Sequence, residues 1–134
     1  MADDREMDLH AEEAALELLE RVLQLSPASQ TEVLLETDTS ALTRFAGNRI
    51  HQNMSSNDCR LSIRVIEEGG IGNTSPNVFD TDSLKNALEW ARQVARSGRI
   101  PAQPPEFPGP QQYTEIANYF EETATFSPDA RAHL

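Results

Sequence analysis

The sequence predicts an α+β fold, in which two helices pack on one face of an antiparallel sheet of about five strands joined as a meander. Two stretches of helical periodicity flank a central stretch of alternating apolar and polar residues, and glycine-bearing turns interrupt that central stretch. The expected order of elements is α-β-β-β-β-β-α, followed by an extended Pro-rich connector.

The central stretch, residues 41–65, is predicted to begin with a β-hairpin. Gly47-Asn48 lies between two alternating runs and suits a two-residue loop, because Gly accepts positive φ without a Cβ clash. This loop would place Thr43 opposite Gln52. The same register would put three apolar side chains on one face, namely Phe45, Ile50 and Met54.

Three further strands are expected over residues 31–37, 59–66 and 71–75, the last at an edge because it is polar and contains Gly. The intervening turns would be residues 38–40, 55–58 and 67–70. Cys59 alternates with Leu61, Ile63 and Val65, which predicts a buried and inert thiol.

Two helices are predicted from a 3.6-residue apolar period. The first begins near Leu9 and ends before Ser26-Pro27, with an apolar stripe of Leu9, Ala15, Leu16, Leu19, Val22 and Leu23. The second follows N-cap candidates at residues 80–83 and ends at Ser97-Gly98, with a stripe of Leu84, Ala87, Leu88, Ala91, Val94 and Ala95. Trp90 is expected to seal the flank of this helix.

The predicted domain organisation has three parts. Residues 1–99 form the α+β domain, with a frayed start over residues 1–8, and residues 100–126 form the extended Pro-rich connector. Phe107 would anchor this connector to the domain surface, and the alternative is a peptide-recognition motif. Residues 127–134 read as the start of a truncated helix of a next domain, because Ser127 suits an N-cap and Pro128 the first helical position.

The composition argues against several classes of function. With 22 acidic and 11 basic residues, the formal net charge is −11, which disfavours direct nucleic-acid binding and docking on an anionic membrane. No apolar run approaches the roughly 20 residues of a membrane-spanning helix, and the N-terminus lacks a hydrophobic signal core. The single Cys allows no internal disulfide, so the predicted location is cytoplasmic.

The sequence contains none of the common catalytic or metal-binding motifs. It has no H-E-x-x-H, no Cys-x-x-Cys and no Gly-rich phosphate loop. His10, His51 and His133 do not have the spacing of metal ligands, and none of them is placed to activate Cys59. We therefore expect no catalytic residue and no metal ligand in this chain.

One local group of cationic residues is unusual in so acidic a chain. Arg44, Arg49, His51, Arg60 and Arg64 are predicted to share the sheet face opposite the core. One interpretation is a solvated face whose arginines pair with nearby Glu. The other is a surface that meets another domain, a partner subunit or an extended peptide, and the sheet edge could also accept a peptide by strand addition.

The order of several short segments resembles the N-terminal domain of the TldD/PmbA family. These segments are residues 43–53, 61–66 and 70–75, and residues 105–110 and 119–124 are similar to the family's connector. The resemblance spans about residues 9–134, and its most specific part is the Asn-Arg-Ile hairpin followed by the Arg-Val strand.

The resemblance implies a role in peptide processing. Full-length members are bacterial and archaeal cytoplasmic proteins, also described as modulators of DNA gyrase. Their active subunit is a zinc metallopeptidase that pairs with a related subunit without metal ligands. Its H-E-x-x-x-H zinc helix lies downstream of this domain, so zinc is expected in the full-length active subunit and none in this fragment.

The resemblance carries no catalytic residue onto this chain, because no position here matches the zinc motif. The expected partners are the related subunit, the downstream domain and an extended peptide substrate. The domain would help to form the substrate channel or the subunit interface. The alternative is a domain of the metal-free subunit or a free-standing protein-interaction module.

Overall fold

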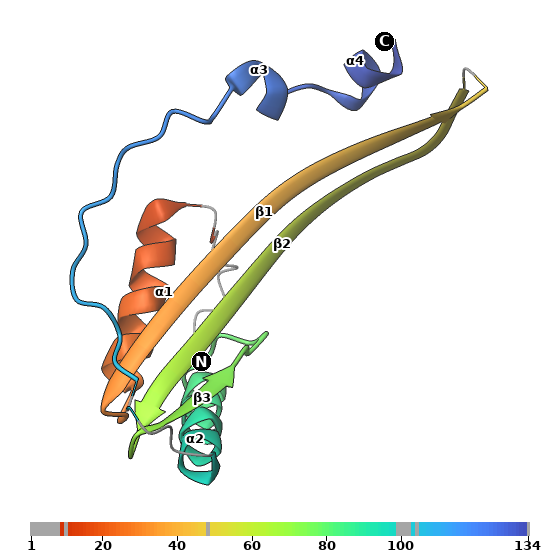
Figure 1. Cartoon of the computed structure of the whole chain (residues 1–134). Coiled ribbons are helices and arrows are strands. Elements are labelled where there is room, and N and C mark those ends of the chain that lie inside the picture. The colour runs from red at the N-terminus through yellow and green to blue at the C-terminus, as the bar shows by residue number, and fades with distance from the viewer. Residues whose placement is uncertain (1–8, 10, 48, 99–102, 104, 134) are drawn as a thin grey trace. The chain divides into compact units, whose positions relative to one another are not determined.

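The computed structural model describes residues 9, 11–47, 49–98, 103 and 105–133 (Figure 1). Within these residues the helices are α1 (Glu12–Leu25), α2 (Thr81–Ser97), α3 (Glu121–Ala124) and α4 (Pro128–Ala132). The described strands are β1 (Gln30–Ala46), β2 (Arg49–Glu67) and β3 (Gly70–Thr74). They form one sheet in the order β1-β2-β3, and β3 pairs antiparallel with β2. The α+β class is confirmed, whereas the prediction of about five strands in the order α-β-β-β-β-β-α is wrong.

The strand count differs because two predicted turns lie inside long strands. Residues 38–40 belong to β1 and residues 55–58 belong to β2. Their polar side chains face each other across the pair, where the Ser40 and Ser56 hydroxyls lie 2.8 Å apart. Neither strand contains a Gly or Pro that would break it. Turn-like composition alone was therefore a misleading signal.

The predicted hairpin register is wrong by one residue. Thr43 Oγ1 donates a hydrogen bond of 3.0 Å to Asn53 Oδ1, so Thr43 shares a face with Asn53 rather than with Gln52. A slip of one residue moves side chains to the other face, so Phe45 does not share a face with Ile50. Gly47 has φ 57°, as predicted for the loop. Asn48, the other predicted loop residue, lies outside the described residues.

The hydrophobic core lies between the two long helices and one face of β2. Its buried side chains are Leu18 and Val22 of α1, Leu61, Ile63 and Val65 of β2, and Leu84, Leu88, Ala91 and Ala95 of α2. The three β2 residues alternate along the strand, so both helices cover the same face of β2.

The core confirms most of the stripe predicted for α2 and corrects that for α1. Leu16 and Leu23 were predicted to be core residues, yet both are exposed, and Leu18 is buried instead. The helix carries leucine on more than one side, so periodicity alone leaves the direction of burial ambiguous. In α2, Val94 is partly exposed.

The strand β3 approaches α2 at the distance of backbone contact. A Cβ on Gly72 would lie 1.8 Å from the carbonyl oxygen of Ala91, and one on Gly70 would lie 2.0 Å from that of Ala95. Both positions therefore require glycine, because no side chain fits between the strand and the helix. The predicted edge position of β3 is confirmed by its place at the end of the sheet order.

Two other expectations about single residues are corrected. Cys59 is exposed rather than buried, because the buried part of β2 begins only at Leu61. Trp90 is 62% exposed and does not seal the helix flank. The N-cap of α2 is confirmed, since Asp80 accepts hydrogen bonds from the backbone N–H groups of Asp82 and Ser83.

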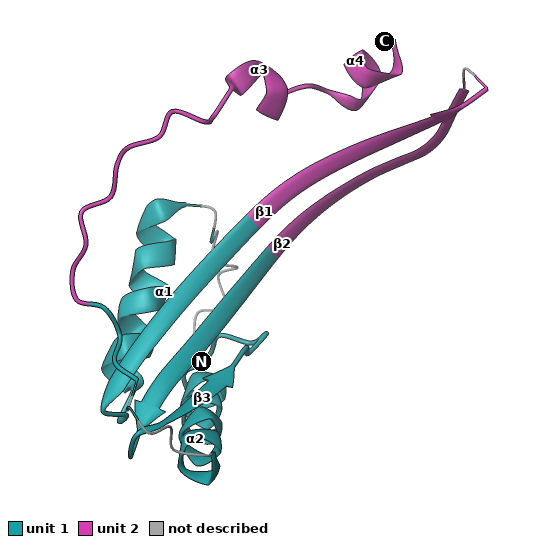
Figure 2. Cartoon of the chain, in the orientation of Figure 1, with its two compact units in different colours: residues 1–37, 59–108 teal, residues 38–58, 109–134 magenta. Residues whose placement is uncertain are grey.

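The chain divides into two compact units, coloured separately in Figure 2. Unit 1 consists of residues 1–37 and 59–108, and unit 2 consists of residues 38–58 and 109–134. Unit 1 contains the whole hydrophobic core. The predicted division into a domain, a connector and a next domain stays a prediction, because the boundaries of the two units are not domain boundaries.

Unit 2 contains the far part of the β1–β2 hairpin, which we call the arm (residues 38–58), together with α3 and α4. Arg131 Nε donates a hydrogen bond of 3.0 Å to Thr43 Oγ1 of the arm. Ser127 caps α4 and Pro128 begins it, as predicted. No helix within the described part of the chain is long and apolar enough to cross a membrane.

Candidate binding groove on the sheet

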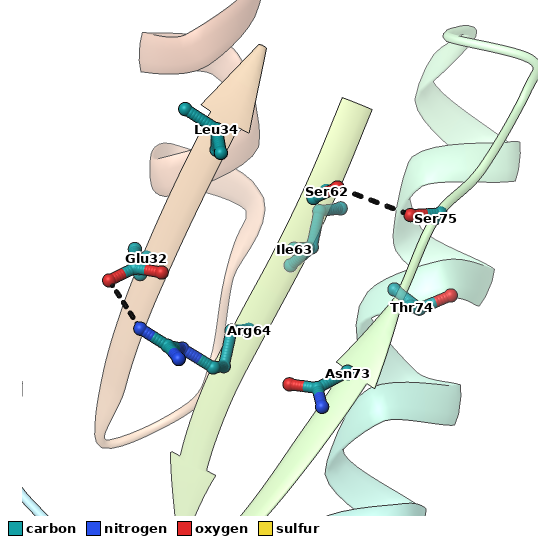
Figure 3. Close-up of a pocket in the computed structure, with 8 residues that line it drawn as sticks. All are labelled: Glu32, Leu34, Ser62, Ile63, Arg64, Asn73, Thr74 and Ser75. Carbon is teal, nitrogen blue, oxygen red and sulfur yellow. Dashed lines mark hydrogen bonds and ion pairs between the residues drawn. The ribbon is translucent and has the colours of Figure 1, made fainter. Parts of the chain in front are cut away.

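Unit 1 has a shallow groove on the sheet face that the core helices leave uncovered. The groove has a volume of about 460 Å³. Eight residues line it, of which seven belong to the three strands and Ser75 directly follows β3 (Figure 3): Glu32, Leu34, Ser62, Ile63, Arg64, Asn73, Thr74 and Ser75. Strand alternation explains the place of Ser62 and Arg64, because both face away from the core that Leu61, Ile63 and Val65 build.

An ion pair crosses the groove between β1 and β2. Arg64 Nη2 donates to Glu32 Oε2 at 2.7 Å, and both side chains are partly exposed (Figure 3). An exposed pair of this kind stabilises a fold by less than about 1 kcal/mol. Its more useful property is geometric, because the pair holds a guanidinium group in a fixed place on the sheet face.

Arg64 also contacts the connector. Its guanidinium carbon lies 5.1 Å from the centre of the Phe107 ring, within the range of a cation–π contact. The backbone N–H of Phe107 donates a hydrogen bond of 2.9 Å to Gln30 Oε1 at the start of β1. Phe107 thus lies against the sheet, which agrees with the anchoring role expected for it.

The rest of the groove offers neutral hydrogen-bonding groups. The hydroxyls of Ser62 and Ser75 lie 3.3 Å apart, and Asn73 and Thr74 add an amide and a further hydroxyl (Figure 3). Such groups match the N–H and C=O groups of a peptide backbone. The lining includes no His or Cys that could act as a general base or nucleophile. The hydroxyl and amide groups of the lining can therefore donate and accept hydrogen bonds.

The structure does not bring the five predicted site residues into one site. Arg60 and Arg64 lie in unit 1, whereas Arg44, Arg49 and His51 lie in unit 2. Within the arm, Arg44 has the parity of Ser40 and Ser56, and Arg49 and His51 have the parity of Asn53, so they lie on opposite faces. Arg64 alone lines the groove. A partner-facing or peptide-facing role for any of the five stays a prediction.

A buried acidic residue escaped the sequence analysis. Glu67, at the end of β2, is 7% exposed and accepts hydrogen bonds from Arg92 at 2.8 Å and from Arg96 at 2.7 Å. The backbone N–H of Ser29 also donates to it at 3.2 Å. Hydrogen bonds from Arg92 and Arg96 lower the pKa of Glu67 to about 2. The available signal was the pair of arginines four residues apart on α2.

Glu67 ties together three separate elements. Its two arginine partners belong to α2, its own position ends β2, and Ser29 precedes β1. The negative charge of Glu67 in turn raises the pKa of Arg92, so both groups stay ionised at neutral pH. We interpret this cluster as a structural clamp rather than a site for a ligand.

The family resemblance implies zinc ligands downstream of this domain rather than within it. Over the described ranges, no group of three or more His, Cys, Asp or Glu side chains could hold a metal ion. Desolvation raises the pKa of the Cys59 thiol, so it is protonated at neutral pH and is a weak ligand and nucleophile.

The fold places the chain in the class of small α+β domains with helices on one face of an antiparallel sheet. Within that class, residues 31–95 match the family model of PmbA/TldA metallopeptidase domain 1. The chain thus carries an N-terminal domain of the TldD/PmbA family. No curated protein sequence matches the chain.

A solved structure has a similar fold. TldE from Thermococcus kodakarensis matches with a TM-score of 0.68 over 86% of this chain, at 18% sequence identity. At this identity the likeness shows the fold alone. The match covers 26% of the TldE chain, so the present chain spans about a quarter of the length of that relative.

Proposed function

We propose that this chain is the non-catalytic N-terminal domain of a TldD/PmbA-type zinc metallopeptidase, and that it binds an extended segment of the peptide substrate. The observation that carries the proposal is the coincidence of groove and family match. All eight residues that line the groove lie within residues 31–95, the part that matches the family model.

The chemistry of the groove supports a peptide ligand. Hydroxyl and amide groups can pair with the peptide backbone, and the Arg64 guanidinium can hold a substrate carboxylate in place of Glu32. Leu34 adds an exposed apolar contact at the groove. The groove would thereby guide a peptide, while zinc and the hydrolytic residues would come from another part of the full-length cytoplasmic protein.

The likeness to TldE supports a related TldD/TldE-type subunit as the partner. In this proposal the domain contributes to the substrate channel or to the contact between such subunits. The strong negative charge of the chain supports a role without direct contact to DNA.

The experiment uses the full-length protein that contains this domain, alone and mixed with its related subunit. We would measure zinc content and chelator-sensitive peptide cleavage. Bound zinc and cleavage would support the proposal. Cleavage that appears only with the related subunit would assign the domain to the metal-free subunit, and no cleavage in either case would contradict the peptidase assignment.

The role of the groove has its own test in Arg64→Ala. Loss of a charged hydrogen bond to the substrate should raise the KM of peptide cleavage about tenfold while kcat and zinc content stay unchanged. The matched control is Lys85→Ala, which removes an exposed positive charge from α2 and should leave KM unchanged. An unchanged KM in Arg64→Ala would show that the groove does not bind substrate.

A further inference from the structure

The outer edge of β3, in unit 1, has none of the features that usually protect an edge strand. The sheet order of the described strands ends at β3, so no described strand pairs with its outer side. Edge strands are commonly protected by charged side chains or by proline. Residues 69–79 carry no charge and β3 contains no proline, whereas β1 at the other edge carries Glu32 and Glu36. The edge at β3 is therefore the one that can accept a further strand.

The pairing of β2 with β3 directs the backbone groups of two residues toward this outer edge. Glu67 and Gly70 close a two-residue hairpin loop, so they form a hydrogen-bonded pair. Hydrogen-bonded and non-hydrogen-bonded pairs alternate along an antiparallel ladder. The N–H and C=O groups of Ile71 and Asn73 therefore point away from β2. Both residues are exposed, which agrees with a free edge.

The helix α2 lies directly over β3, and one of its flanks is turned toward β2. The two elements meet where a Cβ on Gly72 would overlap the carbonyl oxygen of Ala91 (Figure 1). The next residue along the helix, Arg92, donates to the carboxylate of Glu67 on β2 at 2.8 Å. One turn further on, Arg96 donates to the same carboxylate at 2.7 Å. The flank that carries these arginines therefore faces β2.

The opposite flank of α2 faces the outer edge of β3. Successive residues of a helix are about 100° apart around its axis, so Trp90 and Arg92 lie on opposite sides of Ala91. Val94 and Arg96 have the same relation one turn further on. Because the two arginines turn toward β2, Trp90 and Val94 turn toward the side of β3 that has no described partner strand.

This flank is exposed, hollowed and uncharged. Trp90 is 62% exposed and Val94 is 38% exposed, although both side chains are largely apolar. They line a hollow of about 390 Å³ together with Gln93, Ser97 and Gly98. We call these five residues the outer flank of α2. Exposed apolar side chains that gather in one place mark surfaces that another molecule covers.

We propose that an uncharged, extended segment of a partner polypeptide binds along the outer edge of β3 as an added strand, beside Trp90 and Val94. The main chain of the segment pairs with Ile71 and Asn73, as in other cases of strand addition. Alternate side chains of the segment point toward α2 and fill the hollow. Because Gly72 has no side chain, α2 lies close enough to the sheet for its outer flank to contact the added strand.

The surroundings of the edge define the chemistry of this segment. A charged side chain against the outer flank would lose its hydration without gaining a partner, since neither the flank nor residues 69–79 carry a charge. Apolar side chains would gain from contact with Trp90 and Val94. The segment that fits is therefore a stretch of uncharged residues about as long as β3, with apolar side chains at alternate positions.

This inference goes beyond the proposed function. The groove lies on the face of the sheet that the core helices leave uncovered, whereas the outer flank belongs to a helix on the other face. Strand addition at β3 requires neither zinc nor peptide cleavage.

The test uses the fluorescence of Trp90, which is the only tryptophan of the chain. The probe is a capped seven-residue peptide of alternating valine and threonine, titrated into the whole chain. Binding should shift the emission of Trp90 to shorter wavelength, because its ring leaves water. Hydrogen exchange at the amides of Ile71 and Asn73 should slow at least about tenfold. The capped probe has no carboxylate for Arg64, and Trp90 does not line the groove, so the signal reports on the edge.

Altered probes and variants separate main-chain pairing from general apolar contact. A probe with methylated amides on the side that pairs with β3, and a probe with glutamate in place of valine, should each bind at least about tenfold more weakly. Ile71→Pro removes an outward N–H group and Val94→Glu charges the outer flank, so each should weaken binding of the unmodified probe to the same extent.

The matched control is Leu23→Glu, at a position of α1 that is 48% exposed, and it should bind the probe like the unaltered chain. Circular dichroism on each variant would verify that it is folded. The methylated probe needs no variant, so it tests the pairing even if Ile71→Pro does not fold.

Three results would overturn the inference. The emission of Trp90 could stay unchanged up to about 1 mM probe, or the methylated probe could bind as tightly as the unmodified one. The emission could also shift with the concentration of the chain alone, which would mean that the edge pairs with a second copy. Zinc content and peptide cleavage by the full-length protein play no part in these measurements, so the two proposals fail separately.

Discussion

At the scale of single residues, Glu67 connects the end of β2 to α2 through its ion pairs with Arg92 and Arg96. The two positions that follow it, Glu68 and Gly69, have φ values of 52° and 81°. Two positive φ values in a two-residue loop are typical of a type I′ turn, which joins Glu67 and Gly70 as the closing pair. The tight turn fixes the backbone of Glu67, and its carboxylate then meets Arg92 and Arg96 on the helix.

The charge of Glu67 predicts a specific pH dependence of stability. Its pKa in the folded chain is about 2, below the value near 4.3 expected for an unfolded chain. A lowered pKa stabilises the fold above the unfolded value, and this stabilisation is lost as the pH falls through the folded value. Chemical unfolding of the unaltered chain should therefore show a free energy that declines between about pH 5 and pH 2.

Substitution of Glu67 separates this contribution from those of other carboxylates. Glu67→Gln should flatten the decline over that pH window. Glu67→Ala should lower the free energy of unfolding at neutral pH by about 3 kcal/mol, because the largely buried Arg92 guanidinium loses its Glu67 partner and keeps only the half-exposed Glu89. Glu12→Gln, at an exposed position of α1, should retain the decline. A pH profile of Glu67→Gln that matches the unaltered chain would contradict the assignment.

At the scale of elements, the helices could be predicted better than the strands. The stripe of α2 was predicted because Leu84, Leu88, Ala91 and Ala95 repeat at helical spacing, and the Asp80 cap has a residue-level signature. The burial of α1 was predicted with an error because Leu16 and Leu23 form a second stripe beside Leu18 and Val22. A helical period shows that a surface of the helix is apolar, but it does not show whether that surface packs against the core.

The strand boundaries were harder to predict, because pairing with the neighbouring strand, rather than local composition, decides where a strand continues. Residues 38–40 and 55–58 have the composition of turns, yet the hydroxyls of Ser40 and Ser56 pair across two long strands. The absence of Gly and Pro from both segments was the signal that favoured continuous strands. For the groove, the sequence identified Arg64 through its strand parity, but Glu32 and residues 73–75 come together only through the sheet pairing.

The contact of β3 with α2 depends on glycine, which predicts a severe effect of Gly72→Ala. The added methyl would overlap the carbonyl oxygen of Ala91, a backbone atom that cannot move without displacing α2. Overlap of this kind should lower the free energy of unfolding by about 3 kcal/mol or more. Thermal unfolding followed by circular dichroism would measure the loss.

The matched control for this substitution is Gly109→Ala. A Cβ on Gly109 would have no atom within 4 Å, so this variant should unfold at a temperature close to that of the unaltered chain. If Gly72→Ala is as stable as Gly109→Ala, β3 and α2 are not in backbone contact in solution.

At the scale of the whole molecule, β1 and β2 each extend through both units. The side chains that pack on these strands differ between the two units. In unit 1, the buried side chains of β2 are held by two helices. In unit 2, the strands of the arm carry exposed side chains and polar pairs such as Ser40 with Ser56. A strand pair without a packed face is marginal in water. The groove accordingly lies on the part of the sheet that the hydrophobic core supports, and the arm lacks such support.

This difference in support predicts unequal hydrogen exchange along β2. The backbone amides of Leu61, Ile63 and Val65 should exchange at least about 100-fold more slowly than those of residues 50–57, because local opening of the arm exposes little apolar surface. Ile63→Val removes one buried methylene and should cost about 1 kcal/mol in unit 1. It should speed exchange at Leu61 and Val65 while leaving residues 50–57 unchanged. Equal protection along the whole of β2, or a loss that spreads evenly into the arm, would mean that the two units open as one cooperative structure.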